Sequence, residues 1–149
     1  MQRKPTKRFW NAYGQLYGNE KPLATKKPKR TTERKCPTEQ QEQFKLVHWL
    51  KLQKVFFYHI PNGGYRNPIE AAKFKRLGVV PGIPDICVPT AHPRKGYHGL
   101  YIELKRVSGG KVSDSQQECI DILTKNGYKV IVCKGADEAM KAIKDYLNG

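Results

Sequence analysis

The stretch "LYIELKR", Leu100–Arg106, decides the predicted fold. Its apolar residues recur at every second position, which is typical of a β-strand that buries one face. The residues of that face are Leu100, Ile102 and Leu104. Because strand side chains alternate between faces, Glu103 and Lys105 share the opposite face. We therefore expect a strand that is anchored in a core by one face and presents an acid and a base side by side on the other.

The composition indicates a basic protein with room for one domain. The chain has 149 residues, with 28 lysines and arginines against 13 aspartates and glutamates, which gives a formal net charge of +15 and a pI of about 9.8. This length suits one ordinary domain rather than two. So large a positive excess favours a polyanionic partner, and nucleic acid fits best. The alternative is a positive charge that only keeps the protein soluble, but +15 is large for that role on a chain of 149 residues.

The cysteines and the hydropathy pattern exclude several classes of protein. No Cys-x-x-Cys pair is present, so the sequence gives no zinc pattern. Cys87 and Cys133 fall in apolar strand-like segments and Cys119 in a helix-like one, which predicts buried free thiols in a reducing compartment. No apolar run is long enough to cross a membrane, and there is no signal-peptide core. We expect a soluble, cytoplasmic protein with no membrane partner and no small-molecule cofactor.

Residues 1–37 differ in composition from the rest of the chain. They hold eleven lysines and arginines against two glutamates, and "TKKPKRTTERK" has no apolar period. We interpret this segment as a basic N-terminal arm that is partly flexible. Trp10, Tyr13 and Tyr17 in the arm fall at helical spacing, and three roles stay open for them: docking on the domain, packing on a second subunit, or stacking on bases.

From residue 38 onward the pattern predicts alternating helices and strands. Thr38 and Ser113 are predicted N-caps, and Gly127 is a predicted helix stop. Helices are expected over 38–53, 67–78, 112–127 and 136–147, and strands over 55–60, 84–89, 100–106 and 128–135. The order α-β-α-β-β-α-β-α predicts an α/β fold with a mixed central β-sheet flanked by helices, formed by residues 38–149.

Asp85 joins Glu103 and Lys105 in a constellation that suits metal chemistry. It lies at the head of its strand, and a connection of hairpin length leads to the next strand, so both carboxylates are expected at one end of the sheet. Mg²⁺ takes hard oxygen ligands of this kind, and the carbonyl of Leu104 can add a third. Lys105 can then hold the attacking water or stabilise the charged transition state. The alternative is an ordinary ion pair between the lysine and one of the acids.

The histidines do not form a second metal site. None of them has metal-ligand spacing to another. We expect His59 near the mouth of the site and the others, His48, His92 and His98, at the surface. No Gly-x-Ser-x-Gly segment or paired cysteine and histidine points to a nucleophilic enzyme.

These segments together resemble a known family. "GIPDICVP" followed by "GLYIELKR" is similar to the P-D…(D/E)-x-K signature of restriction-endonuclease-like nucleases. The segments "HIPNGG", "LGVVPGIPDI", "IELKR", "GGKVSDSQ" and "NGYKVIVCKGADEAMKAI" resemble the VRR-NUC domain, and in particular its small stand-alone members from phages and bacteria. The resemblance covers about residues 38–147 and implies a restriction-endonuclease-like core.

The resemblance implies roles for individual residues. Asp85 and Glu103 match the metal-binding acids and Lys105 the catalytic lysine. Gln116 matches a glutamine that faces the active site from the start of its helix; a capping or surface role is the alternative. Glu39 matches the acid of the first helix and is a further candidate metal ligand, with Glu42 as the competing choice. Because Glu39 lies one helical turn from Gln43, on the same face, it is preferred.

The resemblance also implies a substrate and an assembly. It predicts a Mg²⁺- or Mn²⁺-dependent DNA endonuclease, with one or two ions per site, that acts as a homodimer on branched DNA such as four-way junctions, in phage or bacterial repair or recombination. The expected nucleic-acid contacts are Asn62, Gly63, Gly64, Arg66, Lys111, Arg3, Lys4, Lys7, Arg8, Lys26, Lys27, Lys29 and Arg30. Two alternatives remain: a non-catalytic nucleic-acid-binding protein, and a nuclease for flaps or linear DNA.

Overall fold

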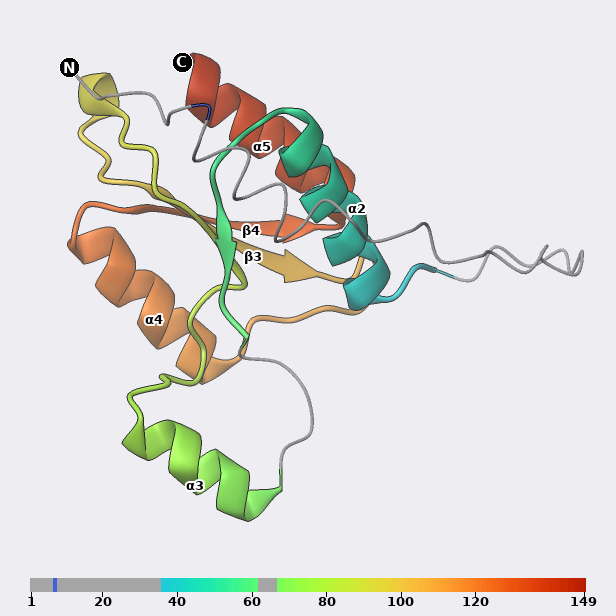
Figure 1. The fold of residues 1–149 in the computed structure, drawn as a ribbon, viewed down its shortest axis with the longest axis vertical. Coiled ribbons are helices and arrows are strands. Elements are labelled where there is room, and N and C mark those ends of the chain that lie inside the picture. Colours follow the sequence, from blue (N-terminus) through green and yellow to red (C-terminus); the bar gives the residue numbers. More distant parts are fainter. Residues whose placement is uncertain (1–6, 8–35, 62–66) are drawn as a thin grey trace, which may run out of the picture. The chain divides into compact units, whose positions relative to one another are not determined.

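The computed structural model describes Lys7, residues 36–61 and residues 67–149. The chain divides between Arg34 and Lys35 into two units, and the elements below belong to the second. Its centre is strand β3, Leu100–Lys105, the stretch with alternating apolar residues (Figure 1).

The described strands form one mixed sheet in the order β1-β2-β3-β4. Strand β1, Tyr58–His59, pairs antiparallel with β2, Ile86–Val88, and β2 pairs antiparallel with β3. Strand β4, Lys129–Lys134, lies parallel to β3 on its other side. The mixed sheet predicted from the sequence is confirmed.

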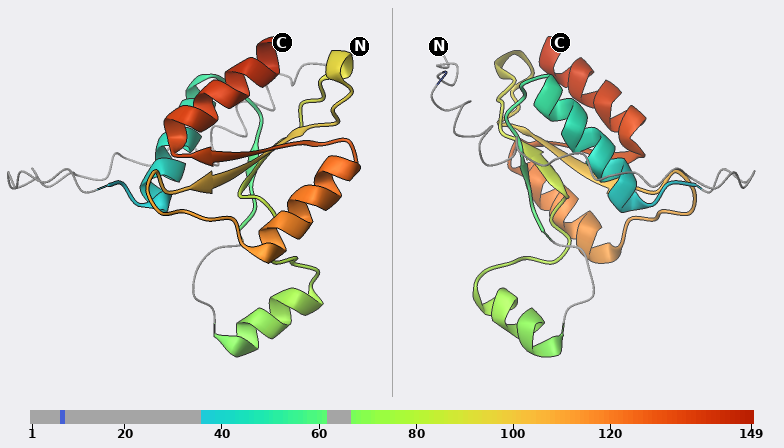
Figure 2. Two further views of the ribbon diagram at one scale, coloured as in Figure 1. Left: turned by 180° about the vertical axis from the view of Figure 1, so that it is seen from behind. Right: turned by 45° about the vertical axis from the view of Figure 1, so that its right-hand side comes forward.

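Helices cover both faces of this sheet. On one face lie α2, Glu39–Leu52, and α5, Ala136–Asn148; on the other lies α4, Asp114–Lys125 (Figure 2). Helix α3, Pro68–Arg76, leads from β1 toward β2, and a short 3₁₀ turn, η1 (Pro93–Lys95), joins β2 to β3. The predicted order of helices and strands is thus confirmed in the described part of the chain.

The helix termini follow the predicted capping residues. The Thr38 hydroxyl accepts a hydrogen bond from the backbone N–H of Gln41, and Gln41 Oε1 accepts one from the backbone N–H of Thr38. This is a reciprocal capping box at the start of α2. Ser113 and Gln116 form the same box at the start of α4. Gly127, with φ of +80°, follows the end of α4.

The core lies between β3 and the pair of helices α2 and α5. Leu100, Ile102 and Leu104 are fully buried there. They pack with residues that α2 and α5 contribute, among them Leu46, Leu50, Ala139 and Ile143. The predicted thiols Cys87, Cys119 and Cys133 are also buried and free. Burial of this apolar face fixes the register of β3, because a slip by one residue would turn Glu103 and Lys105 into the core.

The first two strands are shorter than the sequence predicts. Strand β2 covers only Ile86–Val88 of the expected 84–89, and Asp85, expected at the head of that strand, lies in a bend before it. The expected strand over 55–60 forms ladder pairs only at Tyr58 and His59. The preceding Phe57 is buried in the core instead. The register of β1 sets Phe57 opposite Val88 of β2, so a partner residue is present, and the ladder ends where the Phe57 side chain packs into the core.

No helix in the described residues is long and apolar enough to span a membrane.

Candidate active site

The predicted acids meet at one end of the sheet, where β2 begins and β3 ends. The antiparallel register sets Ile86 opposite Ile102, so Asp85, one residue before β2, lies beside Glu103. The backbone N–H of Leu104 donates to Asp85 Oδ2 at 2.9 Å. This bond fixes the Asp85 carboxylate against the end of β3, although the two residues are far apart in sequence.

Glu103, Lys105 and Gln116 form a closed set of hydrogen bonds. The Lys105 ammonium lies 2.8 Å from Glu103 Oε1 and donates to Gln116 Oε1 at 2.8 Å. The Gln116 amide nitrogen donates to Glu103 Oε1. The side chains of Glu103 and Lys105 are only 2% and 10% exposed. A buried charge needs an opposite charge and hydrogen bonds, and this arrangement supplies both.

Gln116 faces the site and caps its helix at the same time. Its Oε1 accepts from Lys105 and also from the backbone N–H of Ser113 at 3.0 Å. The reverse amide orientation would set the NH₂ group against two donors and the oxygen against a carboxylate, so the network fixes the orientation. The two roles that the sequence left as alternatives therefore coexist in one side chain.

Burial dominates the electrostatics of both acids. Desolvation raises the pKa of Glu103 to about 7; the hydrogen bond from Lys105 opposes this shift, and the charges of Asp85 and Glu39 add to it. Desolvation also raises the pKa of Asp85, against the bond from Leu104 and the charges of His59 and Lys105. Several carboxylates thus compete for positive charge at this end of the sheet.

The two acids of α2 have different surroundings. Glu42 is 7% exposed, and its Oε2 accepts a hydrogen bond from the backbone N–H of Ala136 at 2.7 Å, at the start of α5. Glu42 therefore ties α2 to α5. Glu39 is exposed in the first turn of α2, within electrostatic reach of Glu103. Of the two, Glu39 is the acid that remains accessible beside the site.

The residues at this point suit a hard divalent cation. The backbone groups of Leu104 point toward β2, because those of its neighbour Lys105 face β4, where the Lys105 carbonyl accepts from Gly135 N. Since β2 begins only at Ile86, no strand residue lies opposite the Leu104 carbonyl. Two carboxylates and a carbonyl are hard oxygen donors, and Mg²⁺ commonly completes such a set with water. Among the described residues, no three acidic, histidine or cysteine side chains form a metal cage on their own.

The predicted nucleic-acid contacts fall largely outside the described residues. Lys111 is exposed between β3 and α4, and Lys7 is exposed. The others lie outside the described ranges: Asn62, Gly63, Gly64, Arg66, Arg3, Lys4, Arg8, Lys26, Lys27, Lys29 and Arg30.

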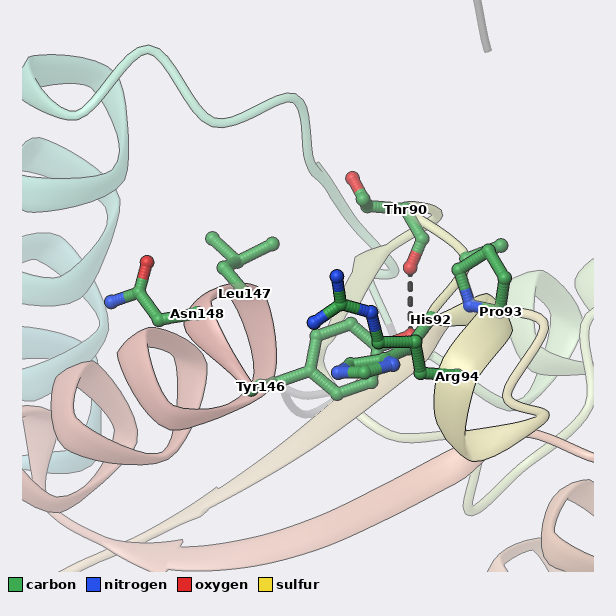
Figure 3. Close-up of a pocket in the computed structure, with 9 residues that line it drawn as sticks. Thr90, His92, Pro93, Arg94, Tyr146, Leu147 and Asn148 are labelled. Atoms are coloured by element: carbon green, nitrogen blue, oxygen red, sulfur yellow. Dashed lines mark hydrogen bonds between the residues drawn. The ribbon is translucent and has the colours of Figure 1, made fainter. Parts of the chain in front are cut away.

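The opposite end of the sheet holds a separate cavity of about 210 Å³ between η1 and the end of α5 (Figure 3). There Tyr146 donates its hydroxyl proton to the Thr90 carbonyl at 2.7 Å, and His92 packs edge-on against the Tyr146 ring. The prediction of a surface position for His92 is wrong, since the residue is 8% exposed. Its burial depends on α5, which the local sequence does not reveal. None of the predicted site residues lines this cavity.

Gly82 is a positioning residue that its local sequence does not reveal. Its φ is +88°, and a Cβ atom built there would lie 2.3 Å from the carbonyl oxygen of Ser115 and 2.8 Å from the backbone nitrogen of Gln116. The loop before Asp85 thus packs directly on the first turn of α4. A glycine three residues before an aspartate was the only signal available in the sequence.

Comparisons with known proteins identify a family that matches most of this chain. The VRR-NUC domain family matches residues 37–137. A solved structure described as a VRR_NUC domain protein is 36% identical in sequence, with a TM-score of 0.67 over 76% of this chain and 91% of the other. A search of curated proteins gives no match.

Replacement of Gly82 by alanine should destabilise the fold beside the site, because the added Cβ atom clashes with the start of α4. Gly78 offers a matched control, because its φ is +87° and a Cβ atom there meets open space. Gly78→Ala should cost about 1–2 kcal/mol of backbone strain, and Gly82→Ala about 1–3 kcal/mol more, from the clash with α4. Urea unfolding of both variants measures the difference. Equal losses of unfolding free energy in the two variants would show that the loop at Gly82 is not closely packed against α4.

The raised pKa of Glu103 makes the stability of the metal-free protein depend on pH. The group binds its proton more tightly when folded, with pKa values of 4.5 unfolded and about 7 folded. The stabilisation that this group adds to the folded state is therefore fully present below pH 4.5 and is lost as the pH rises through 7. The free energy of unfolding is measured in EDTA for wild type and for Glu103→Gln. The difference, wild type minus variant, should fall by up to about 3 kcal/mol as the pH rises from 4.5 through 7. A difference that stays constant or grows with pH would contradict this assignment.

Proposed function

Because this chain belongs to the VRR-NUC domain family, we propose that it is a metal-dependent DNA endonuclease that hydrolyses phosphodiester bonds. Family membership implies a nuclease-type function with DNA as substrate. The observation that carries the finer proposal is the meeting of Asp85, Glu103 and Lys105 at one sheet end. A protein that only binds DNA gains nothing from buried acids beside its ligand, because they repel phosphate.

The proposed metal ligands are Asp85, Glu103 and the Leu104 carbonyl, with Glu39 nearby. A bound Mg²⁺ or Mn²⁺ supplies a water of lowered pKa and neutralises charge on the phosphoryl group. The residues themselves fit this role, because oxygen donors and surplus negative charge gather at one point.

Lys105 has the position of a charge-stabilising group. Gln116 and Glu103 hold its ammonium by two contacts of 2.8 Å, and they are hydrogen-bonded to each other. A preorganised donor of this kind stabilises a developing negative charge without first having to reorient. Lys105 therefore donates to the attacking water or to a phosphate oxygen, while Gln116 keeps the lysine and Glu103 in register.

We further propose branched DNA, such as a four-way junction, as the substrate and a homodimer as the active form. Symmetric cutting of two strands needs two active sites, and one chain of this length supplies one. The positive charge of residues 1–37 supports a role in DNA binding, with an affinity that falls steeply as salt rises.

Loss of the Lys105 ammonium should abolish cutting but not binding. Lys134 is a matched control, because it lies directly opposite Lys105 in the sheet register and is exposed. With Mg²⁺ or Mn²⁺, Lys105→Ala should cleave labelled four-way junctions at least about 100-fold more slowly than wild type. Lys134→Ala should cleave normally, and EDTA should stop all cleavage. A gel-shift assay in Ca²⁺ should give similar affinities for all three proteins.

The same assay separates the alternatives. Junctions, flaps, nicked duplexes and linear duplexes are compared side by side with each metal. Undiminished cutting by Lys105→Ala would contradict the proposed mechanism. Faster cutting of flaps or linear DNA would overturn the junction preference. Tight binding without cutting of any substrate would identify a nucleic-acid-binding protein instead.

A further inference from the structure

The His59 side chain contacts the backbone carbonyl of Asp85 and makes no hydrogen bond to its carboxylate. Its Nδ1 lies 2.8 Å from the carbonyl oxygen of Asp85 and 2.9 Å from the side-chain amide nitrogen of Gln43. Gln43 belongs to α2, one turn after Glu39. The imidazole thus stands between the strand that carries one proposed metal ligand and the helix that carries another candidate.

The chemistry of these contacts fixes which ring nitrogen acts. A carbonyl oxygen only accepts hydrogen bonds, so a 2.8 Å contact requires the proton on Nδ1. The same oxygen also accepts from the backbone N–H of Ile60 at 2.8 Å, and its two lone pairs accommodate both donors. With the proton on Nδ1, the Gln43 amide takes the reverse orientation, because its NH₂ group would otherwise face a second donor. The Nδ1 proton is then shared between the Asp85 carbonyl and the Gln43 amide oxygen. Nε2 takes no part in either contact.

The backbone carbonyl of Asp85 receives two hydrogen bonds among the described residues. Strand β1 has two residues and pairs with β2 only at Cys87 and Ile86. Asp85 itself lies in a bend before β2. Its carbonyl is held by His59 and Ile60, and its carboxylate by Leu104. His59 therefore supplies the side-chain contact to this carbonyl, beside the backbone contact from Ile60.

We propose that His59 is a positioning residue. Its Nδ1–H holds the Asp85 carbonyl and, through Gln43, ties β2 to α2, which sets Asp85 and Glu39 at the spacing that the site requires. Groups that orient metal ligands in this way commonly contribute about 10- to 100-fold to metal affinity or activity. The part of this inference that concerns catalysis rests on the proposed nuclease function.

Two amide replacements separate the ring nitrogens. An asparagine side chain sets its NH₂ near the position of Nδ1, whereas a glutamine side chain sets it near that of Nε2. His59→Asn should keep Mn²⁺ affinity and kcat within about threefold of wild type, whereas His59→Gln should lower both by about 10- to 100-fold with little change in KM. Mn²⁺ affinity is measured by electron paramagnetic resonance, and cleavage on the same junction substrate.

Further variants guard against misfolding and general effects. Gln43→Leu should weaken Mn²⁺ binding in the same direction, and combining it with His59→Gln should give less than the summed effect, because both remove one bridge. His48→Gln changes an exposed histidine of α2 and should leave both measurements unchanged. Thermal unfolding of each variant identifies any loss that comes from misfolding, in which case Gln43→Leu decides the question.

The two His59 variants can give four results, and each supports or overturns the role of Nδ1. Wild-type behaviour of His59→Gln, or equal losses in both His59 variants, would overturn the proposal. Loss in His59→Asn alone would assign the role to Nε2 and overturn it as well. If wild type binds Mn²⁺ but cuts no DNA, the nuclease proposal fails while the Mn²⁺ affinities still test His59. If wild type binds no Mn²⁺, both proposals fail.

Discussion

The burial of one carboxylate, Glu103, on the central strand constrains the rest of this structure. A charge removed from water costs several kcal/mol unless opposite charge and hydrogen bonds replace the lost hydration. Lys105 supplies the charge, and Gln116 bonds both partners at once. The carboxyl still carries a pKa of about 7, so the compensation is incomplete. The divalent cation proposed above would complete it.

The elements around Glu103 can be understood as supports for that point. The apolar face of β3 fixes the strand register, and the start of α4 presents Gln116. Gly82 allows the loop before Asp85 to approach α4 closely, and Glu42 joins α2 to α5. Each support comes from a different segment of the chain. The geometry of the site therefore depends on tertiary packing rather than on one local motif.

Much of this arrangement is predictable from the sequence, because it rests on local rules. Strand alternation gives the two faces of β3, and capping residues give the starts of α2 and α4. The convergence of Asp85 and Glu103 follows from a connection of hairpin length between two strands. The rest depends on contacts between distant segments: the short β1, the burial of His92 by Tyr146, the bond from Ala136 to Glu42, and the approach of Gly82 to Ser115. No local pattern encodes these contacts.

The central claim is that Asp85 and Glu103 hold a divalent cation at the end of the sheet. The most direct test is a crystal structure with Mn²⁺, in which anomalous scattering locates the ion. We predict an anomalous peak within ligand distance of both carboxylates and of the Leu104 carbonyl. A peak at another place would contradict the claim. So would the absence of any peak at saturating Mn²⁺ in a structure where Lys105 is still paired to Glu103.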